Sequence, residues 1–419
     1  MRDSILRGLL CVATALLVVA CGNSALPYDA PCLPTQAAPL HAVKADGAVP
    51  PFETIYHDLV PLPNDVQPWA PTWSPDGQHI LFNNIADGNE WLVNADGSNP
   101  RCLTCDMADV PKIPGAFSYV FPDNQRLFLA NELGDFAYVL ECAPSLSACS
   151  SHAIFPIDLT ADSTLVKASR GRRTFHLAPD GVHLAYSMVR LDALIMLVSE
   201  LQKTATGYAA VNHRVVNPPG PSGLGDSNVE GYANAGQLFE FKSFVDGGAS
   251  ALVIGEPVDG NADTLKLDLA TGQLTRLTSD IDWDEDGAIS PDGQNLLVAS
   301  WRTMRRLEAF GQMPLGKPFF DYPLGAAVAI YYVSSFEGFQ CDLQPWLLPA
   351  DGDRNATLRG QPLAPYKGGD IITGNNLGAL SFWSPDSTRV LIQERRTNRP
   401  TADANTATKQ KGYSPNRLL

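Results

Sequence analysis

The stretch WSPDGQHILF, residues 73–82, joins a four-residue turn to a short strand. In such a β-turn, Ser accepts a hydrogen bond at the first position and Pro sets φ at the second. Asp is tolerated at the third position and Gly closes the turn. The residues that follow are β-branched, aromatic or apolar and partly alternate with polar ones, which is typical of a strand. The stretch therefore predicts a tight turn that leads into a β-strand.

The same phrase recurs along the chain. It returns as FPDNQ (121–125), LAPDG (177–181), ISPDG (289–293) and WSPDS (383–387). An apolar run follows each copy: QRLFLAN, VHLAYSM, QNLLVAS and TRVLIQE. The long gap before residue 289 holds a degenerate copy without the Pro, which reads GQLFEFKSF, then VDGG, then ASALVIGEP. These copies make six units of roughly 45 to 90 residues each.

Further strands follow the turn and its first strand within a unit. NEWLVNADGSNPRCLTC (89–105) contains two of them around an Asp-Gly turn, and DTLKLDLATGQLTRLTSD (263–280) and QPWLLPADGDRNATL (344–358) repeat that pattern. About four strands per unit predict propeller blades, because one blade cannot bury both of its faces alone whereas a closed ring of blades can. We expect an all-β fold, a six-bladed β-propeller over residues 52–396, with seven blades as the alternative.

WSPDGQHILF followed by EWLVNADGSNPRCLT resembles the PD40-type (WD40-like) repeat of the TolB family, over about residues 55–395. The resemblance implies a six-bladed propeller. It says less about function, since such propellers also occur in peptidase accessory domains and oligogalacturonate lyases. TolB itself carries an extra N-terminal α/β domain, for which the segment before residue 52 leaves no room.

The ends of the ring are expected to meet. The segment ETIYHDLVPL (53–62) precedes the first turn without a partner of its own, and the last unit has only two clear strands. We therefore expect residues 53–62 to pair with the strands around 380–395 and complete the last blade. Residues 397–419 are expected to form a C-terminal tail or a closing strand, which ends on Arg417-Leu418-Leu419.

The N-terminus has the features of an export signal. Arg2 and Arg7 precede an apolar run, residues 9–20, that is too short to span a bilayer comfortably. The run ends in Val-Val-Ala-Cys at residues 18–21, which looks like a bacterial lipobox. Residues 1–20 are thus predicted to be a signal peptide and Cys21 the lipidated residue. The alternative is a plain secretory signal with an incidental Cys.

Residues 21–51 are rich in Ala and Pro and show no periodicity, which predicts a lipidated tether. The expected location is the cell envelope, lipid-anchored and extracytoplasmic, on the periplasmic side or at the cell surface. The formal net charge is −15, and it becomes −16 once residues 1–20 are removed. So acidic a chain is not expected to bind nucleic acid, and its contact with the membrane is expected through the lipid anchor only.

The sequence gives no positive sign of catalysis. The seven His residues are scattered, and no HExxH, GxSxG, P-loop or GxGxxG opening a helix is present. No catalytic residue is therefore predicted, and the sequence favours a protein without enzymatic activity over an enzyme. A dispersed site in a propeller channel would escape this kind of motif analysis.

An acidic run offers a metal site. Asp282, Asp284 and Asp286, followed by Gly287, match the first half of a calcium loop, in which alternate carboxylates converge on a hard cation. The twelfth position is Gly293 instead of the Glu that an EF-hand requires. Ca²⁺ is the only cofactor that the sequence indicates. The alternative to a calcium site is a solvated loop that leads into the innermost strand of the fifth unit.

Charged residues just before the turns are expected to rim the central channel. Arg172, Arg173 and His176 precede the third turn, and Asp284, Glu285 and Asp286 precede the fifth. These opposite charges are expected to form a salt-bridged rim. The alternative is that they bind a polar ligand together.

Six Cys residues remain besides Cys11, in the signal, and Cys21. An exported location and an even number favour disulfides. Cys142 and Cys149 flank a hairpin tip and form the first predicted pair, and Cys102 with Cys105 forms the second. That leaves Cys32 and Cys341 for each other.

Together these features predict an exported, lipid-anchored propeller that binds or scaffolds envelope proteins. The alternative is a channel-centred enzyme, or a glycan or small-molecule binder.

Overall fold

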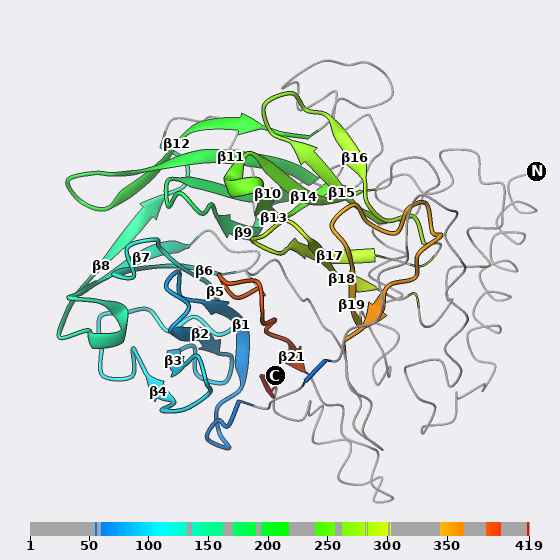
Figure 1. Cartoon of the computed structure of the whole chain (residues 1–419). Helices are drawn as coiled ribbons and strands as arrows, with labels where there is room; N and C mark the ends of the chain where they lie inside the picture. The colour runs from blue at the N-terminus through cyan, green and yellow to red at the C-terminus, as the bar shows by residue number, and fades with distance from the viewer. Residues whose placement is uncertain are drawn as a thin grey trace, which may run out of the picture.

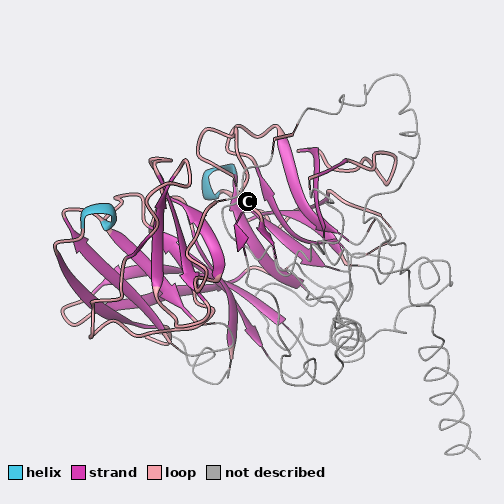
Figure 2. Ribbon diagram, turned by 90° about the horizontal axis from the view of Figure 1, so that it is seen from below, coloured by secondary structure: helices cyan, strands magenta, loops and turns pink. Residues whose placement is uncertain are grey.

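The computed structural model describes residues 55–56, 60–131, 136–161, 171–189, 194–217, 239–255, 262–280, 282, 284–300, 302, 344–363, 383–394 and 417–418. Within these ranges the regular structure is β-strand apart from two single-turn 3₁₀ helices, η1 (Leu146–Ala148) and η2 (Asp246–Gly248) (Figure 2). The predicted all-β class is confirmed there. None of the helices in these ranges has the length and apolarity that a membrane crossing requires. The predicted signal (1–20) and tether (21–51) lie outside the described residues.

Within the described residues, strands β1 to β20 form five four-stranded antiparallel units, in each of which every strand pairs with the next one along the chain. The units are β1 (Pro68–Trp73), β2 (His79–Asn84), β3 (Glu90–Asn94) and β4 (Arg101–Cys102); β5 (Phe117–Val120), β6 (Arg126–Ala130), β7 (Ala137–Ala143) and β8 (Ser151–Asp158); β9 (Arg172–Leu177), β10 (His183–Val189), β11 (Leu194–Lys203) and β12 (Tyr208–Val215); β13 (Phe239–Val245), β14 (Ser250–Gly255), β15 (Asp263–Asp268) and β16 (Leu274–Arg276); β17 (Asp284–Ile289), β18 (Asn295–Ser300), β19 (Gln344–Pro349) and β20 (Gln361–Pro362). The copy without Pro thus forms the first two strands of the fourth unit, as predicted.

The repeated turn joins the first two strands of its unit. In the first unit, Ser74 Oγ donates a hydrogen bond to Asp76 Oδ1 at 2.6 Å, and Gly77 N donates to Ser74 O at 2.8 Å. Gly77 has φ of +68°, which a residue without Cβ adopts at little cost. Ser290 and Ser384 make the same hydroxyl-to-carboxylate hydrogen bond in their own turns. The Ser-Pro-Asp-Gly sequence therefore forms the tight turn between two strands that was predicted from it.

The core lies between neighbouring units. Each hydrophobic cluster of buried residues draws on at least two units: Leu81 of the first unit packs with Leu127 of the second, and Phe241 of the fourth packs with Met196 of the third. Stacking in this way buries both faces of a sheet whose strands are apolar on both sides. Sheets placed side by side around a centre, each buried against the next, give the arrangement of a β-propeller (Figure 1).

The second and third units are also joined at their outer strands. β8 and β12 run parallel and pair over two residues, Ile157 with Tyr208 and Asp158 with Ala209. The two units thereby form one continuous eight-stranded sheet.

The last unit contacts the first one. Gln393, in β21 (Gln393–Glu394), accepts a hydrogen bond through Oε1 from the buried Ala70 N at 3.0 Å. The Arg389 guanidinium lies 4.6 Å from the centre of the Trp73 ring, and Leu391 packs in the core cluster that contains Trp73. The two ends of the fold therefore meet, as the repeat predicted.

The segment that pairs with the last unit is not residues 53–62, as expected, but β22 (Arg417–Leu418). Residues 55–56 and 60–62 are not in a strand, and β21 pairs instead with β22 (Arg417–Leu418). The prediction for residues 53–62 is thus wrong where the structure describes them, while the C-terminal closing strand is present. Ile55, Val60 and Leu62 still pack against core clusters of the last and first units, so their apolar character reflects packing and not pairing.

Candidate functional site

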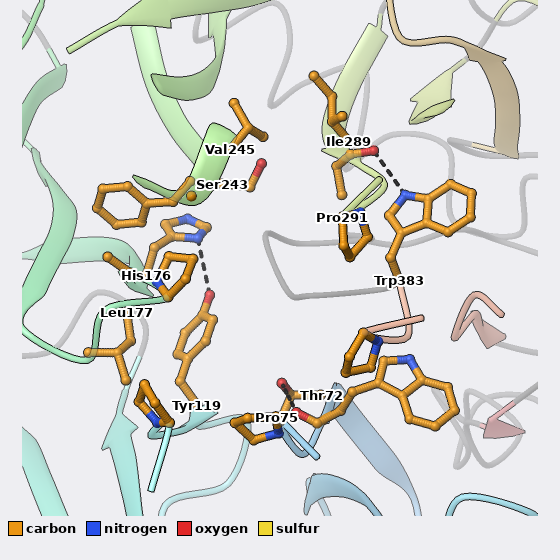
Figure 3. Close-up of a pocket in the computed structure, with 18 of the residues that line it drawn as sticks. Thr72, Pro75, Tyr119, His176, Leu177, Ser243, Val245, Ile289, Pro291 and Trp383 are labelled. Atoms are coloured by element: carbon orange, nitrogen blue, oxygen red, sulfur yellow. Dashed lines mark hydrogen bonds between the residues drawn. The ribbon is translucent and has the colours of Figure 1, made fainter. Parts of the chain in front are cut away.

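The repeated turns converge on one cavity of about 460 Å³ (Figure 3). Every sequence unit contributes to its wall, including the last one through Trp383 and Pro385. Five of the lining residues are the prolines of the turns: Pro75, Pro122, Pro179, Pro291 and Pro385. The repeated turn is a local sequence signal, and it thus places a proline from five of the six units around one cavity.

Tyr119 and His176 lie together in the wall of the cavity, from β5 and β9 (Figure 3). Tyr119 Oη and His176 Nδ1 are 3.1 Å apart, and His176 packs on the Phe241 ring with centroids 5.2 Å apart. Burial, and secondarily the charge of Asp286, raise the pKa of Tyr119 well above its usual value. Its hydroxyl therefore keeps its proton at neutral pH.

A buried cluster of charges lies on the strands that carry these residues. Lys242 of β13 is 3% exposed, and its Nζ lies 2.8 Å from Glu240 Oε2, 3.1 Å from Glu285 Oε1 and 2.7 Å from Asp286 Oδ1. Arg173 Nε of β9 adds an ion pair of 2.7 Å to Glu240 Oε1. Three neighbouring units are thereby linked at their first strands.

In this cluster, burial and ion pairing shift the pKa values of the charged groups in opposite directions. Although burial alone would raise the pKa of Glu240, the charges of Arg173 and Lys242 lower it to about 2. Burial would lower the pKa of Lys242, but Asp286 and Glu240 hold it well above its usual value. Burial raises the pKa of Asp286 to about 6 in spite of Lys242. The charged states of Glu240 and Lys242 are therefore held by opposite charges within the cluster.

The residues predicted to rim the channel are partly brought together. Arg173, Glu285 and Asp286 belong to the cluster, and His176 lies in the cavity wall. Arg172 is buried in β9. The charges of the third and fifth units are linked through Glu240 and Lys242 of the fourth unit.

Sequence reasoning missed Glu240 and Lys242 because their unit lacks the Pro and was treated as degenerate. A signal was present: two charged residues alternate with Phe239, Phe241 and Ser243 in a strand that otherwise reads as buried. In a strand with two buried faces, such charges need partners on a neighbouring strand.

Asp284 has a separate partner. Its two carboxylate oxygens lie 3.0 and 2.9 Å from Arg302 Nη2, and both side chains are fully buried. Burial raises the pKa of Asp284 to about 6, against the opposing effect of Arg302.

The calcium hypothesis rests on Asp282, Asp284 and Asp286. Asp284 faces Arg302, Asp286 faces Lys242, and Asp282 is buried. Among the described residues, His, Cys, Asp and Glu side chains form no group of three or more that is placed to hold a metal ion. The calcium hypothesis stays a prediction. The solvated-loop alternative is wrong, because all three aspartates are buried. The pairing of Asp284 and Asp286 with cations agrees with the salt bridges expected for the channel rim.

Both disulfides predicted within the described residues are present. Cys102 and Cys105 are joined with their Cα atoms 5.7 Å apart, and Cys142 and Cys149 with theirs 5.1 Å apart. Both separations lie in the usual range for a disulfide. Cys21, Cys32 and Cys341 lie outside the described residues.

Comparison with known proteins gives distant structural likenesses. No protein-family model and no curated protein sequence matches the chain. A putative TolB from Agrobacterium tumefaciens is 15% identical with a TM-score of 0.45, over 78% of this chain and 88% of that one. A calcium-binding protein, regucalcin, from the same species is 12% identical with a TM-score of 0.43, over 86% and 92% of the two chains. TolB from Acinetobacter baumannii is 14% identical with a TM-score of 0.37, over 57% and 53%. These values are too low to assign a family, so the propeller architecture rests on sheet order and on the convergence of the turns.

Proposed function

We propose that this chain is an exported, lipid-anchored, six-bladed β-propeller of the cell envelope that binds another protein at the cavity where its turns converge. The observation that carries the proposal is the cavity itself. It is formed by one turn from each unit, whereas the buried charges nearby are already paired with one another. Binding sites in ring-shaped folds gather at such convergent loops.

The proposed count of six blades is supported by the last unit, which adds to the five four-stranded ones. Trp383 and Val390 form an antiparallel bridge, and β21 pairs with β22, so the last unit also contains paired backbone. Its side chains complete the core between the fifth unit and the first. Six turns around one cavity agree with six blades.

Binding is favoured over catalysis by the state of the titratable groups. Glu240 and Asp286 face Lys242, Asp284 faces Arg302, and the Tyr119 hydroxyl keeps its proton. Of these groups only Tyr119 lines the cavity, and its hydroxyl keeps the proton that a nucleophile would have to lose.

Site-specific cross-linking tests the proposal. Benzoylphenylalanine is placed at Pro291, an exposed residue of the cavity wall, and in a matched control at Thr271, an exposed residue of the β15–β16 turn. The expected result is a discrete cross-linked protein in membranes that depends on position 291. Equal cross-linking from both positions, or none from position 291, would contradict binding at the cavity.

The second candidate is a small-molecule or glycan binder. The cavity volume of about 460 Å³ lies in the range of small-molecule pockets, and its wall offers the paired Tyr119 and His176 for hydrogen bonding. Native mass spectrometry of the membrane-purified protein distinguishes the two candidates. A co-purified small molecule that Tyr119→Phe releases would favour this second function over the first.

A further inference from the structure

The cavity is surrounded by one aspartate from each turn. All six are exposed, and they are Asp76, Asp123, Asp180, Asp246, Asp292 and Asp386. Five of them follow a lining proline directly, and Asp246 lines the cavity itself. In each case the pKa lies below its usual value: hydrogen bonds from Ser290 and Gln294 lower the pKa of Asp292, and those from Ser384 and Thr388 lower the pKa of Asp386 to about 2. All six are therefore ionised at neutral pH.

Three of the six aspartates have a basic partner. Asp123 pairs with Arg126 at 2.6 Å, Asp180 with His183 at 2.5 Å, and Asp246 with Lys266 at 2.6 Å. These three, the paired aspartates, belong to the second, third and fourth units. The charges of Asp123 and Asp246 are thus compensated by a cation on the surface itself, whereas Asp180 is hydrogen-bonded to the His183 imidazole.

The other three form what we call the open arc: Asp76, Asp292 and Asp386. Their hydrogen bonds come from hydroxyls and backbone N–H groups of their own turns, and none of them forms a salt bridge with a described residue. Two basic groups lie near the open arc. Burial lowers the pKa of His79, which lies close to Asp76, so its imidazole is neutral at neutral pH. The Arg389 guanidinium stacks on Trp73 and donates to Ala95 O at 2.7 Å.

The open arc is continuous. The turn of the fifth unit contacts that of the last unit, where Asp292 N donates to Ser387 Oγ at 3.0 Å. The turn of the last unit contacts that of the first, where a Cβ at Gly77 would lie 3.6 Å from Pro385. One side of the cavity mouth is thus a continuous acidic edge, above a wall that contains Trp383, Pro291 and Pro75 (Figure 3).

We infer that the partner presents a basic segment with apolar side chains, which places its Lys or Arg residues over the open arc and its apolar groups against the prolines and Trp383. The inference rests on the proposed function and adds the chemistry of the partner. Charge complementarity of this kind steers association and fixes which way round a segment binds. The net charge of −15 on the whole chain adds to the attraction at long range.

The test uses the mature protein and a fluorescein-labelled peptide of repeated Lys-Pro-Leu units. One variant carries Asp76→Asn, Asp292→Asn and Asp386→Asn. Its control carries Asp87→Asn, Asp96→Asn and Asp268→Asn, which removes the same number of charges from turns that do not line the cavity. Asn keeps the side-chain oxygen that accepts the turn hydrogen bonds, so both variants should fold, and circular dichroism checks this.

We expect the open-arc variant to bind the peptide about tenfold more weakly than the wild type at low salt, and the control variant within about twofold. The same peptide with Glu in place of Lys should not bind, and the Lys peptide should cross-link to benzoylphenylalanine at position 291. Equal losses in the two variants would overturn the inference, because net charge alone would explain them. Unchanged binding in the open-arc variant, or no binding by the wild type, would overturn it too. If the membrane cross-link from position 291 persists in these cases, the proposed function still stands.

Discussion

At the scale of single residues, Glu90 is a buried carboxylate between the first two units. It is 2% exposed, and it accepts hydrogen bonds from Asn83 Nδ2 at 2.7 Å and Ser118 Oγ at 2.8 Å. Burial outweighs these hydrogen bonds and the charge of Lys112, and it raises the pKa of Glu90 from 4.5 to about 7. The folded protein therefore holds this proton more tightly than the unfolded chain does.

The raised pKa predicts a pH dependence of stability. The contribution of Glu90 is fully present below pH 4.5 and is lost as the pH rises through about 7, because the carboxylate must then ionise while buried. Glu90→Gln removes this ionisation. We expect the wild type to lose about 3 kcal/mol relative to the variant between pH 4.5 and 8, measured by urea unfolding. A constant difference between the two proteins would contradict the prediction.

The pair of Asp284 and Arg302 predicts a large effect of a single substitution. Arg302→Met leaves a buried carboxylate without its cation, and we expect a loss of about 3 to 5 kcal/mol in the free energy of unfolding. Arg354→Met serves as the control, because Arg354 pairs with the exposed Asp351 and its loss should cost less than about 1 kcal/mol. Similar losses in the two variants would show that Asp284 is not held by Arg302.

At the scale of the turns, two glycines with the same backbone shape separate backbone strain from crowding. Gly77 and Gly181 have φ of +68° and +67°. A Cβ at Gly77 would lie 3.6 Å from Pro385, whereas one at Gly181 would lie 2.7 Å from Pro122 Cδ. Both substitutions by Ala strain the backbone, but only the second also forces two neighbouring turns apart.

We therefore expect Gly77→Ala to cost about 1 kcal/mol and Gly181→Ala roughly 2 to 4 kcal/mol. Thermal unfolding of the two variants measures the difference. Equal costs would mean that the turns of the second and third units do not press on each other.

The turns and the strands that follow them could be predicted from sequence because Ser, Pro, Asp and Gly act locally. The partner of a strand could not, since pairing depends on which edge is free in the folded ring. For this reason the sequence predicts that the apolar segment 53–62 pairs with the last unit, whereas in the structure β22 pairs with β21. The role of Lys242 could not be predicted for a related reason: two of its partners, Glu285 and Asp286, lie on β17, far away along the chain.

At the scale of the whole molecule, the predicted anchor has a direct consequence. Cys21→Ala should move the protein from the membrane fraction to the soluble exported fraction, because the acyl chains on Cys21 would be the main attachment to the bilayer. Fractionation with detection by immunoblot measures this, and Cys11→Ala is the control because that residue lies in the predicted signal. A wild-type protein that is already soluble after export would rule out lipidation.

The parallel pairing of β8 with β12 has a consequence for how these molecules behave at high concentration. An outermost strand with unpaired N–H and C=O groups can recruit the same strand of another copy and so start aggregation. The outermost strands β4, β16 and β20 are only two or three residues long, while β8 and β12 have eight residues each. The two long edges partly cover each other, and Gly207 permits this because a Cβ there would lie 2.5 Å from Pro156 O. The pairing of β8 with β12 thus partly protects the two longest edge strands, which would otherwise be the most prone to intermolecular strand pairing.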